Sequence, residues 1–544
     1  MFNSKQINNR IKAAFIILIL VVILGVSLYK IINYGLYLSP DSYIYLDTAQ
    51  NIHHGRGIVH SFVLTSELEH WEGGSSYIPV SYWAPGFPIY IYLIKSIEKN
   101  IPFATAGAVG VWVAYLLTFI SLFFLLIYNY NLQVGIWGIL FFSIYYPILY
   151  TYSWVWSDGI VIPLILISLW LIMENPKPYY KPRLFLAGIL AGIAFSIRYI
   201  LGIVFPYGIF IIFALTLFYQ NNVPRKIRML QSILNSFVYF IGWACLSLPV
   251  IIRNFTTTGT LLGTSRPSSY IPIFKNIQYA LVSLTREIFP PMIIPSEIQI
   301  QVLLALFLIY LLFIVIRKNR ACIKPLIHDR FLRVFIGWGL LYFVSITLYA
   351  SFYQIDTLGH RLLLPFSIVL IILMSVLSEK IIPSPYWLLA PLSVLAGVCF
   401  CYAYPVDNSP FYTTTTVLKE DARGKWICSN TRSGDWIIGD STFDIHLLCD
   451  NRRSYCFVPG AVRDTPPNKK DFDTFFQKIP SDTTRVFIVL RKAVPLEELY
   501  YDSWIQYYGD VITELFFTGK YGNIVAVSLY SGRGLLSAEI RLQE

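Results

Sequence analysis

Charged side chains are scarce in this sequence, because Asp, Glu, Lys and Arg make up only 13% of its 544 residues. Soluble globular chains carry about 25% charged residues, so the scarcity excludes a soluble enzyme and also an intrinsically disordered chain. The sequence has no internal repeat, no low-complexity tract and no Gly-X-Y period of the collagen type. Its seven cysteines form no CxxC pair and no His/Cys spacing of the kind that binds zinc.

Most residues of the chain are hydrophobic. They account for 56% of the chain, and the mean hydropathy is +0.58. Aromatic residues reach 17%, which is typical of a protein partly surrounded by lipid, since Tyr and Trp settle at the membrane interface. The composition therefore predicts a polytopic α-helical membrane protein.

The net charge of +11 is unevenly distributed along the chain. Residues 405–544 contain 16 Lys and Arg against 18 Asp and Glu, whereas residues 1–404 contain 26 against 13. The basic excess thus belongs to the apolar part of the chain, where it sets the orientation in the membrane. We expect no nucleic-acid partner.

Apolar runs long enough to cross about 30 Å of hydrocarbon predict about eleven transmembrane helices. The run from 184 to 218 carries a single charge, Arg198, and we interpret it as two helices in a tight hairpin that turns at this residue. The predicted spans are 13–33, 102–127, 134–152, 158–174, 184–198, 199–218, 232–252, 298–316, 334–351, 362–378 and 385–404.

The loop charges predict the orientation of these spans. With a cytoplasmic N-terminus, one side of the membrane receives 16 Lys and Arg against three acidic residues, and the other side receives ten of each within residues 1–404. Positive charge accumulates on the cytoplasmic side, so we expect a multi-pass protein of the plasma (inner) membrane with its C-terminal domain outside. The alternative, in which the first run is a cleaved signal sequence, is disfavoured because no small-residue cleavage site follows it.

Two domains are expected. Residues 1–404 form the transmembrane domain, which includes a first outer loop at 34–101 and a second at 253–297. Residues 405–544 alternate short apolar strands with helical stretches and predict a small extracytoplasmic α/β domain. Its three cysteines permit one disulfide in the oxidising compartment, and Cys449–Cys456 is one option that the spacing leaves open.

The first outer loop opens with an acidic helix. Pro40 is suited to a first helical turn and Gly55 to a helix end, and the helix between them places Asp41 and Tyr45 on one face. Asp41 would then lie near the membrane–water boundary, where a carboxylate could accept a proton from a hydroxyl. The alternative is that Asp41 merely caps its helix, as Asp does well.

Two further outer segments combine aromatic residues with Pro, Gly or Asp. Tyr82 opens the first, Tyr-Trp-Ala-Pro-Gly-Phe-Pro, and the apolar stretch 89–94 after it is too short to span, so we expect an interfacial helix. Asp158 lies in the second, the Trp-rich turn between the third and fourth spans. This turn is either a plain interfacial turn or the wall of a cavity, because ionisable groups at membrane depth usually face cavities.

Basic residues recur at the same predicted level of the outer rim, at Arg198, Arg253, His360 and Arg361. Arg198 either extends to the interface as a structural residue or holds a lipid-linked phosphate, whose geometry a guanidinium matches. Together the four residues favour an anionic lipid headgroup as the ligand.

The order of these motifs resembles the C-type (GT-C) integral-membrane glycosyltransferases that use polyprenyl-phosphate sugars, in particular their protein-mannosyltransferase and aminoarabinose-transferase branch. The motifs are Asp-Ser-x-x-Tyr and Gly-x-Gly in the first loop, Pro-Gly-x-Pro, Ser-Asp before the fourth span, Ala-Gly-Ile-Leu-Ala-Gly-Ile-Ala-Phe-Ser-Ile-Arg (187–198), and Arg-Leu-Leu-Leu-Pro (361–365). The resemblance covers residues 1 to about 378.

The resemblance implies a catalytic aspartate at Asp41, a second acidic position at Asp158, which we also assign as catalytic, and a basic residue near the donor phosphate at Arg198 or Arg361. Some relatives carry an acid and a lysine just before the Pro-rich segment, but no charge stands near Trp83 here. This departure argues against an aminoarabinose-like donor.

The implied reaction is an inverting sugar transfer from a polyprenyl-phosphate donor to a glycan, lipid or protein hydroxyl, which would contribute to cell-envelope glycans. Asp41 would act as the general base, and the basic groups would stabilise charge on the departing phosphate. We assign the donor phosphate to Arg198, Arg361, Arg253 and His360, and the substrate pocket to Tyr45, His53, His54 and Tyr82. No cofactor is required; a divalent cation held by His53, His54 and His60 near Asp41 is an open alternative.

Two other functions compete with this one. A transporter or flippase of lipid-linked sugars would span the membrane similarly, but transporters often show inverted repeats and broken helices at mid-membrane. A non-catalytic anchor that presents the outer domain to a partner is the second. The residues do not identify the sugar or the acceptor.

Overall fold

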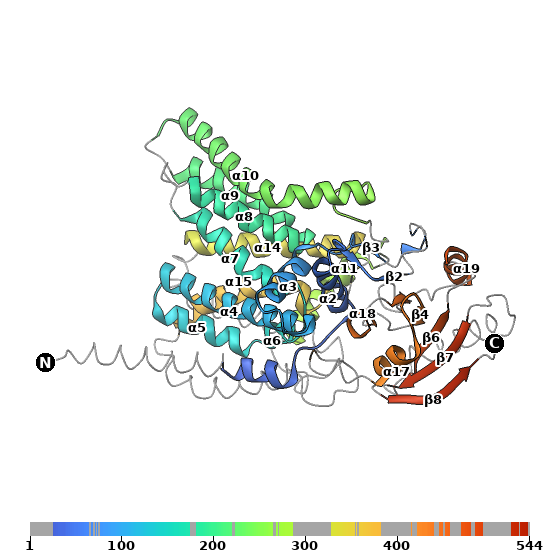
Figure 1. Cartoon of the computed structure of the whole chain (residues 1–544). Coiled ribbons are helices and arrows are strands. Elements are labelled where there is room, and N and C mark those ends of the chain that lie inside the picture. The colour runs from blue at the N-terminus through green and yellow to red at the C-terminus, as the bar shows by residue number, and fades with distance from the viewer. Residues whose placement is uncertain are drawn as a thin grey trace. The chain divides into compact units, whose positions relative to one another are not determined.

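The chain forms two compact units in a computed structural model (Figure 1). The helical unit comprises Met1–Asn33, Ser81–Phe87 and Ala108–Val406, and the mixed unit comprises Tyr34–Val80, Pro88–Gly107 and Asp407–Glu544. The contacts thus group most of the first outer loop with residues 407–544. The structure describes residues 25–64, 67–68, 71, 73, 77–174, 181–219, 223–264, 268–269, 271–286, 328–353, 355, 358–381, 415, 422–439, 445–449, 452–456, 469–479, 485–492, 524–531 and 534–541.

The helical unit consists of apolar helices. Five helical segments of the described residues are long and apolar enough to cross a membrane, namely Phe103–Asn129, Tyr199–Phe218, Arg225–Thr258, Arg330–Phe352 and Arg361–Lys380. The chain is therefore an integral membrane protein. The elements are α4 (Phe103–Asn129), α5 (Leu132–Ile144), α6 (Tyr146–Tyr152), α7 (Asp158–Met173), α8 (Lys181–Ile197), the 3-10 helix η2 (Tyr199–Ile203), α9 (Val204–Tyr219), α10 (Arg225–Thr258), α11 (Ile273–Arg286), α14 (Arg330–Phe352) and α15 (His360–Ile381).

Most predicted spans within the described residues coincide with one of these helices, and the break at Arg198 is present between α8 and η2. The stretch predicted as one span over 134–152 is not one continuous helix, because α5 ends and α6 begins on either side of Tyr145. Pro147 has no N–H to donate to the carbonyl of Ser143, so a helical hydrogen bond is missing at this break. The predicted spans 298–316 and 385–404, and most of 13–33, lie outside the described residues.

Small residues let α8 approach α10 closely, and the two helices lie side by side in Figure 1. Gly188 and Gly192 of α8 form a Gly-xxx-Gly pair, the pattern that permits close packing between membrane helices. A Cβ atom at Gly192 would lie 2.7 Å from the carbonyl oxygen of Trp243 on α10, and one at Gly188 would overlap the carbonyl of Tyr239. This part of the 187–198 motif therefore serves helix packing.

The mixed unit contains a six-stranded sheet of order β2-β5-β4-β6-β7-β8, parallel except for the antiparallel pair β7–β8. Its edge strand β2 comes from the first outer loop and pairs with β5, with Phe62 opposite Ser454. The strands are β2 (Phe62–Leu64), β4 (Trp436–Gly439), β5 (Arg453–Cys456), β6 (Val486–Lys492), β7 (Ile524–Ser531) and β8 (Gly534–Arg541), and a second sheet pairs β1 (Val59–His60) with β3 (Ile78–Pro79). Paired strands cannot be separated by a bilayer, so the first loop and the C-terminal strands share one side of the membrane.

Helices of the mixed unit come from the same two parts of the chain. They are α2 (Pro40–His53), most of α3 (Gly86–Ile97), α17 (Ala422–Asn430), α18 (Ile445–Leu448) and α19 (Lys469–Lys478). The helix expected after Pro40 and the short helix expected over 89–94 are both present, as α2 and α3. The placement of α3 at the membrane interface stays a prediction.

One disulfide joins Cys428 of α17 to Cys449 after α18, with Cα atoms 5.4 Å apart. The pairing Cys449–Cys456 is therefore wrong, and Cys456 is a buried residue of β5. The seven-residue spacing of that option does not determine which cysteines come close together in the fold.

Candidate functional site

Asp158 and Arg198 form an ion pair in the helical unit. Asp158 is the first residue of α7 and is only 3% exposed. Arg198 lies between α8 and η2 with an extended backbone, φ −148° and ψ 116°, which ends α8 and turns its side chain toward α7. Each charge compensates the other, as a buried carboxylate and a guanidinium near lipid require.

A second guanidinium lies beside this pair. Arg361, in the first turn of α15, is positioned over the ring of Trp156 at 4.8 Å from its centroid, a cation–π arrangement. Trp156 is two residues before Asp158 and stacks on Trp154 with ring centroids 4.8 Å apart. The start of α7 and the turn before it thus contact both basic residues. Asp158 contacts Arg198, and Trp156 contacts Arg361.

Tyr342 of α14 connects the two arginines further. Its hydroxyl donates to the carbonyl oxygen of Leu362, the residue after Arg361, at 2.8 Å. The same hydroxyl lies within electrostatic range of Arg198. Polar residues of α7, α14, α15 and the break after α8 therefore lie close together.

Arg253 joins the same region through α10. Its Nη1 donates to Asn254 Oδ1 at 3.4 Å, and Asn254 Nδ2 donates to the hydroxyl of Tyr199 at 3.0 Å. Tyr199 follows Arg198 directly and donates to the carbonyl oxygen of Trp83 at 3.4 Å. Tyr82 packs edge-on against Trp83, with ring centroids 5.8 Å apart.

The Pro-Gly-x-Pro segment is held against the end of α8. A Cβ atom at Gly86 would lie 2.6 Å from the carbonyl oxygen of Ser196, so only glycine permits this approach. Ser81, at the start of this segment, contacts the loop after α10, because its Oγ is 2.5 Å from Thr264 Oγ1. Residues 81–87 thus lie between the end of α8 and the loop after α10.

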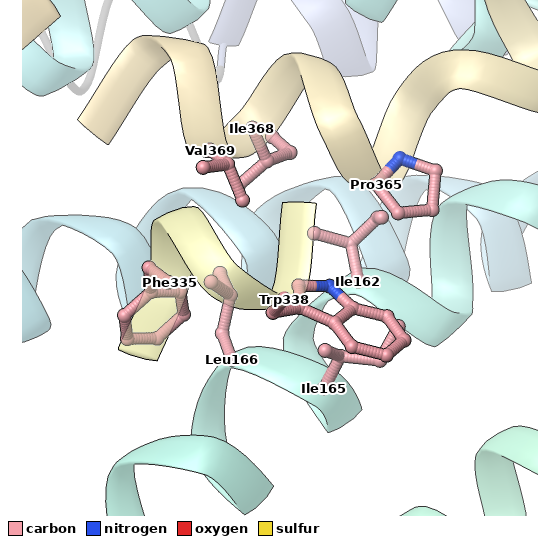
Figure 2. A pocket seen from close by; sticks show the side chains of 8 residues that line it. All are labelled: Ile162, Ile165, Leu166, Phe335, Trp338, Pro365, Ile368 and Val369. Carbon is pink, nitrogen blue, oxygen red and sulfur yellow. The ribbon is translucent and has the colours of Figure 1, made fainter. Parts of the chain in front are cut away.

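Asp158, Arg198, Arg361 and Tyr342 are called the polar cluster below. A small apolar pocket lies on α7, α14 and α15, one helical turn from this cluster (Figure 2). Ile162 is one turn after Asp158, Pro365 one turn after Arg361, and Trp338 one turn before Tyr342. The pocket is lined by Ile162, Ile165, Leu166, Phe335, Trp338, Pro365, Ile368 and Val369.

Asp41 belongs to the mixed unit, where it stands in the first turn of α2 and is partly exposed. The N-cap of α2 is Ser39, which shares a reciprocal capping box with Ser42. The alternative that Asp41 serves as the cap is therefore wrong, because Ser39 accepts the hydrogen bond that a cap must accept.

The other first-loop candidates also belong to the mixed unit. Tyr45 is buried in α2, whereas His53 and His54 at the end of α2 are exposed. The ring of His53 lies 5.6 Å from that of Phe103 and 6.2 Å from that of Tyr92. His360 is the first residue of α15 in the helical unit.

His60 is not available as a metal ligand. Its Nδ1 donates to the carbonyl oxygen of Phe62 at 2.7 Å, and its Nε2 pairs with Glu67 Oε1 at 3.0 Å. Burial disfavours the imidazolium, but the Glu67 carboxylate outweighs burial and raises the pKa of His60. Within the described ranges, no three His, Cys, Asp or Glu side chains group as metal ligands, and the cation alternative for His53 and His54 stays a prediction.

Asp47 is a buried acid that the sequence analysis missed. It is 1% exposed on α2 and accepts a hydrogen bond from the Ser61 backbone N–H at 2.5 Å. Asn51, one turn later, donates to Ser61 Oγ at 2.7 Å and to Asp47 Oδ2 at 3.5 Å. Burial raises the pKa of Asp47 to about 6, although the Ser61 N–H and His60 oppose this. The i, i+4 spacing of Asp47 and Asn51 was the one available signal.

The fold is that of the C-type integral-membrane glycosyltransferases, so the class expected from the motif order is confirmed at the level of the fold. In particular, the chain is similar to ArnT from Cupriavidus metallidurans, in a crystal structure with bound undecaprenyl phosphate. The TM-score is 0.50 and the identity 10%, over 81% of this chain and 86% of that one.

Two structures of the Archaeoglobus fulgidus oligosaccharyltransferase are also similar. The apo form gives a TM-score of 0.48 at 12% identity over 82% of this chain and 64% of that one. The complex with an inhibitory peptide and dolichol-phosphate gives 0.44 at 12% identity, over 82% and 65%. No protein-family profile and no curated protein sequence matches the chain.

The candidate residues are thus distributed over both units. The helical unit brings together Asp158, Arg198, Arg253, Arg361 and Tyr82 through the contacts above. The mixed unit holds Asp41, Tyr45, His53 and His54. The catalytic and binding roles assigned to all of them stay predictions.

The ion pair of Asp158 and Arg198 should be strongly coupled. We expect Asp158→Asn to lower the free energy of unfolding by about 3 kcal/mol, since it removes the carboxylate that compensates the partly buried guanidinium of Arg198. The double variant Asp158→Asn/Arg198→Gln should be more stable than the sum of the two single changes implies. Thermal unfolding in detergent measures this cycle.

The pair Glu174–Arg183 is the matched control, because its N···O distance is 2.6 Å but its arginine side chain is 39% exposed. Its coupling should be below about 1 kcal/mol. Equal coupling in both cycles would contradict a special role for the Asp158 pair.

Asp47 should make the mixed unit less stable as pH rises. A carboxyl whose pKa is raised to about 6 holds its proton more tightly in the folded state, so the stabilisation present at acid pH is lost between about pH 4 and 6. Asp47→Asn removes this dependence. Maleimide labelling of the buried Cys456 thiol, read by mass spectrometry, reports opening of the unit.

The labelling rate of the wild type relative to Asp47→Asn should rise up to about 100-fold between pH 4 and 7, which corresponds to roughly two pKa units. Comparison at each pH cancels the titration of the thiol and of His60 and His446. The ratio of wild type to Asp471→Asn, a change on α19, should not vary with pH. A constant ratio of wild type to Asp47→Asn from pH 4 to 8 would show that the pKa of Asp47 is the same in the closed and the opened unit.

Proposed function

We propose that the protein transfers a sugar from a polyprenyl-phosphate donor to an acceptor hydroxyl on the extracytoplasmic side of the membrane. The observation that carries this proposal is the convergence of Arg198 and Arg361 on the turn that holds Trp156 and Asp158. It occurs in a helical unit whose fold is shared with ArnT, a protein crystallised with undecaprenyl phosphate.

The two arginines suit the phosphate of such a donor. A guanidinium presents donors in a planar fork that matches phosphate oxygens. Its attraction for the phosphate charge is screened least where water is sparse. Negative charge grows on the phosphate as the sugar leaves, so Arg198 and Arg361 would stabilise the transition state more than the bound donor. Arg253 and His360 complete the assigned phosphate residues.

Asp158 is assigned to hold Arg198 in place. Its carboxylate already compensates the guanidinium, and protonating it would break the ion pair. We therefore assign the proton acceptor to Asp41, which is partly exposed in the first turn of α2. Tyr45, His53, His54 and Tyr82 are assigned to the substrate pocket.

The proposed step is a direct displacement. The acceptor oxygen bonds to the anomeric carbon while the bond from this carbon to the phosphate oxygen breaks. Asp41 takes the hydroxyl proton, and the electron pair of the broken bond leaves with the polyprenyl phosphate. Attack from the face opposite the leaving group inverts the anomeric centre. General-base assistance of this kind contributes about 10²–10⁴-fold in rate.

The side of the reaction follows from the mixed unit. Disulfides such as Cys428–Cys449 persist in oxidising compartments and are rare in the cytosol. Because β2 pairs with β5, the loop that carries Asp41 lies on the same side as this disulfide. We therefore propose an extracytoplasmic reaction in the plasma (inner) membrane, with the N-terminus in the cytoplasm.

The apolar pocket one turn from the polar cluster suits the hydrocarbon next to the phosphate. Its lining residues are apolar, and its small size fits a methyl branch of an isoprenoid better than a whole chain. The acceptor is a hydroxyl of a glycan, lipid or protein.

Replacing Asp41 by Asn should abolish transfer. Membranes that contain the protein are supplied with a radiolabelled polyprenyl-phosphate sugar, and the label that leaves the donor is measured. Asp41→Asn should reduce the transfer rate by about 10²–10⁴-fold, the typical contribution of a general base, without changing the amount of protein in the membrane.

Glu98→Gln is the matched control, because Glu98 is an exposed acid of the same unit, and it should leave the rate unchanged. Undiminished transfer by Asp41→Asn would exclude Asp41 as the base. Passage of intact donor across a vesicle membrane without transfer would instead establish a flippase and overturn the proposed function.

A further inference from the structure

Two charged residues of the polar cluster, Asp158 and Arg361, stand in turns that a proline distorts. Asp158 precedes Gly159, whose carbonyl would accept from residue 163 in a regular helix, but residue 163 is proline. In α15, Pro365 has no N–H for the carbonyl of Arg361, four residues earlier, and Leu362 lies in the same turn. A proline displaces the carbonyls of the turn before it, so donors from other elements can stabilise α7 and α15 at these turns.

The hydroxyl of Tyr152 supplies the donor in α7. It lies 2.9 Å from the carbonyl oxygen of Gly159, and Tyr152 is completely buried. The ring packs so closely on Gly159 that a Cβ atom there would lie 2.9 Å from Tyr152 Cδ1 and 3.0 Å from Cζ. The glycine of the Ser-Asp-Gly turn is therefore required for this contact.

Thr118 of α4 orients the Tyr152 hydroxyl. Its Oγ1 is 2.6 Å from the Tyr152 oxygen. Thr118 Oγ1 also lies 2.8 Å from the carbonyl oxygen of Ala114. Each hydroxyl carries one proton, so the bond from Tyr152 to Gly159 requires Thr118 to donate to Tyr152 instead of to Ala114. A hydrogen-bond chain thus runs from α4 through Tyr152 to the first turn of α7.

Tyr342 makes a related contact in α15, with a carbonyl in the turn before Pro365. It is 1% exposed, and its hydroxyl donates to the carbonyl oxygen of Leu362 at 2.8 Å. The two tyrosines come from different elements, α6 and α14, and each bonds the residue that follows a charged member of the cluster. Among the described residues, Asp158 and Arg361 are thus each followed directly by a tyrosine-bound carbonyl in a proline-containing helix.

We infer that Tyr152 and Tyr342 are positioning residues, which set the places of Asp158 and Arg361 by satisfying carbonyls in the two proline-containing turns. The inference rests on the proposed function for its catalytic consequence, but its structural content is independent. Neither tyrosine needs to touch the substrate. Without its hydroxyl, the first turn of α7 or of α15 would move relative to the other charged groups.

The test compares Tyr152→Phe and Tyr342→Phe with Tyr115→Phe. Tyr115 is a buried tyrosine of α4 whose ring lies 5.2 Å from that of Tyr152, but its hydroxyl has no hydrogen-bond partner within the part of the chain that the structure describes. All three changes remove one buried hydroxyl and keep the ring. Thr118→Val is a second way to weaken the Tyr152 bond.

Amide hydrogen exchange on the full-length protein is the first readout. Tyr152→Phe should raise exchange about tenfold in peptides covering residues 156–166, Tyr342→Phe should do so in 360–369, and Tyr115→Phe should do neither. Thr118→Val should resemble Tyr152→Phe with a smaller change. Unchanged exchange in both tyrosine variants, or an equal rise in Tyr115→Phe, would overturn the inference whatever the enzyme does.

Transfer kinetics are the second readout. Misplaced charges should lower kcat about tenfold, within the up to about 100-fold loss that misplacement by 1 Å can cause, while KM for the donor stays within about twofold. Tyr115→Phe should keep both values. Local exchange changes in a protein that transfers no sugar would refute the proposed function and leave the positioning roles intact. A fall in kcat in all three variants alike would contradict them.

Discussion

The ion pair of Asp158 with Arg198 is the interaction on which the polar cluster depends. Either charge alone would be costly near lipid, where uncompensated ions are rare, so the pair forces the start of α7 and the end of α8 together. Arg198 can reach α7 only because its extended backbone ends α8. Trp156, two residues before Asp158, then contacts Arg361, and both guanidinium groups come to one turn.

The surrounding packing holds this turn in place through residues without charge. Gly188 and Gly192 let α8 lie against α10, and Gly86 lets the Pro-Gly-x-Pro segment lie against the last turn of α8. In lipid every backbone polar group needs an internal partner, and a proline inside a helix removes one N–H donor. In α7 the Tyr152 hydroxyl donates to the Gly159 carbonyl, which would otherwise accept from residue 163, and in α15 the Tyr342 hydroxyl donates to the Leu362 carbonyl next to Arg361.

Local signals in the sequence predicted local features well. A single charge in 35 apolar positions identified the break at Arg198, and the order of motifs identified the class of fold. Features that depend on distant parts of the chain were missed. The burial of Asp47 arises only when Ser61 folds back onto α2. Likewise, the pairing of β2 with β5 joins residues almost 400 positions apart, and the disulfide partner of Cys449 was a choice that spacing does not determine.

A cryo-electron microscopy structure of the protein in a lipid nanodisc with undecaprenyl phosphate would locate the phosphate among the basic residues. We expect phosphate oxygens within about 2.7–2.9 Å of guanidinium nitrogens of both Arg198 and Arg361, with Asp158 still paired to Arg198. Phosphate density remote from both arginines, or an Arg198 side chain directed into the acyl chains, would contradict this expectation.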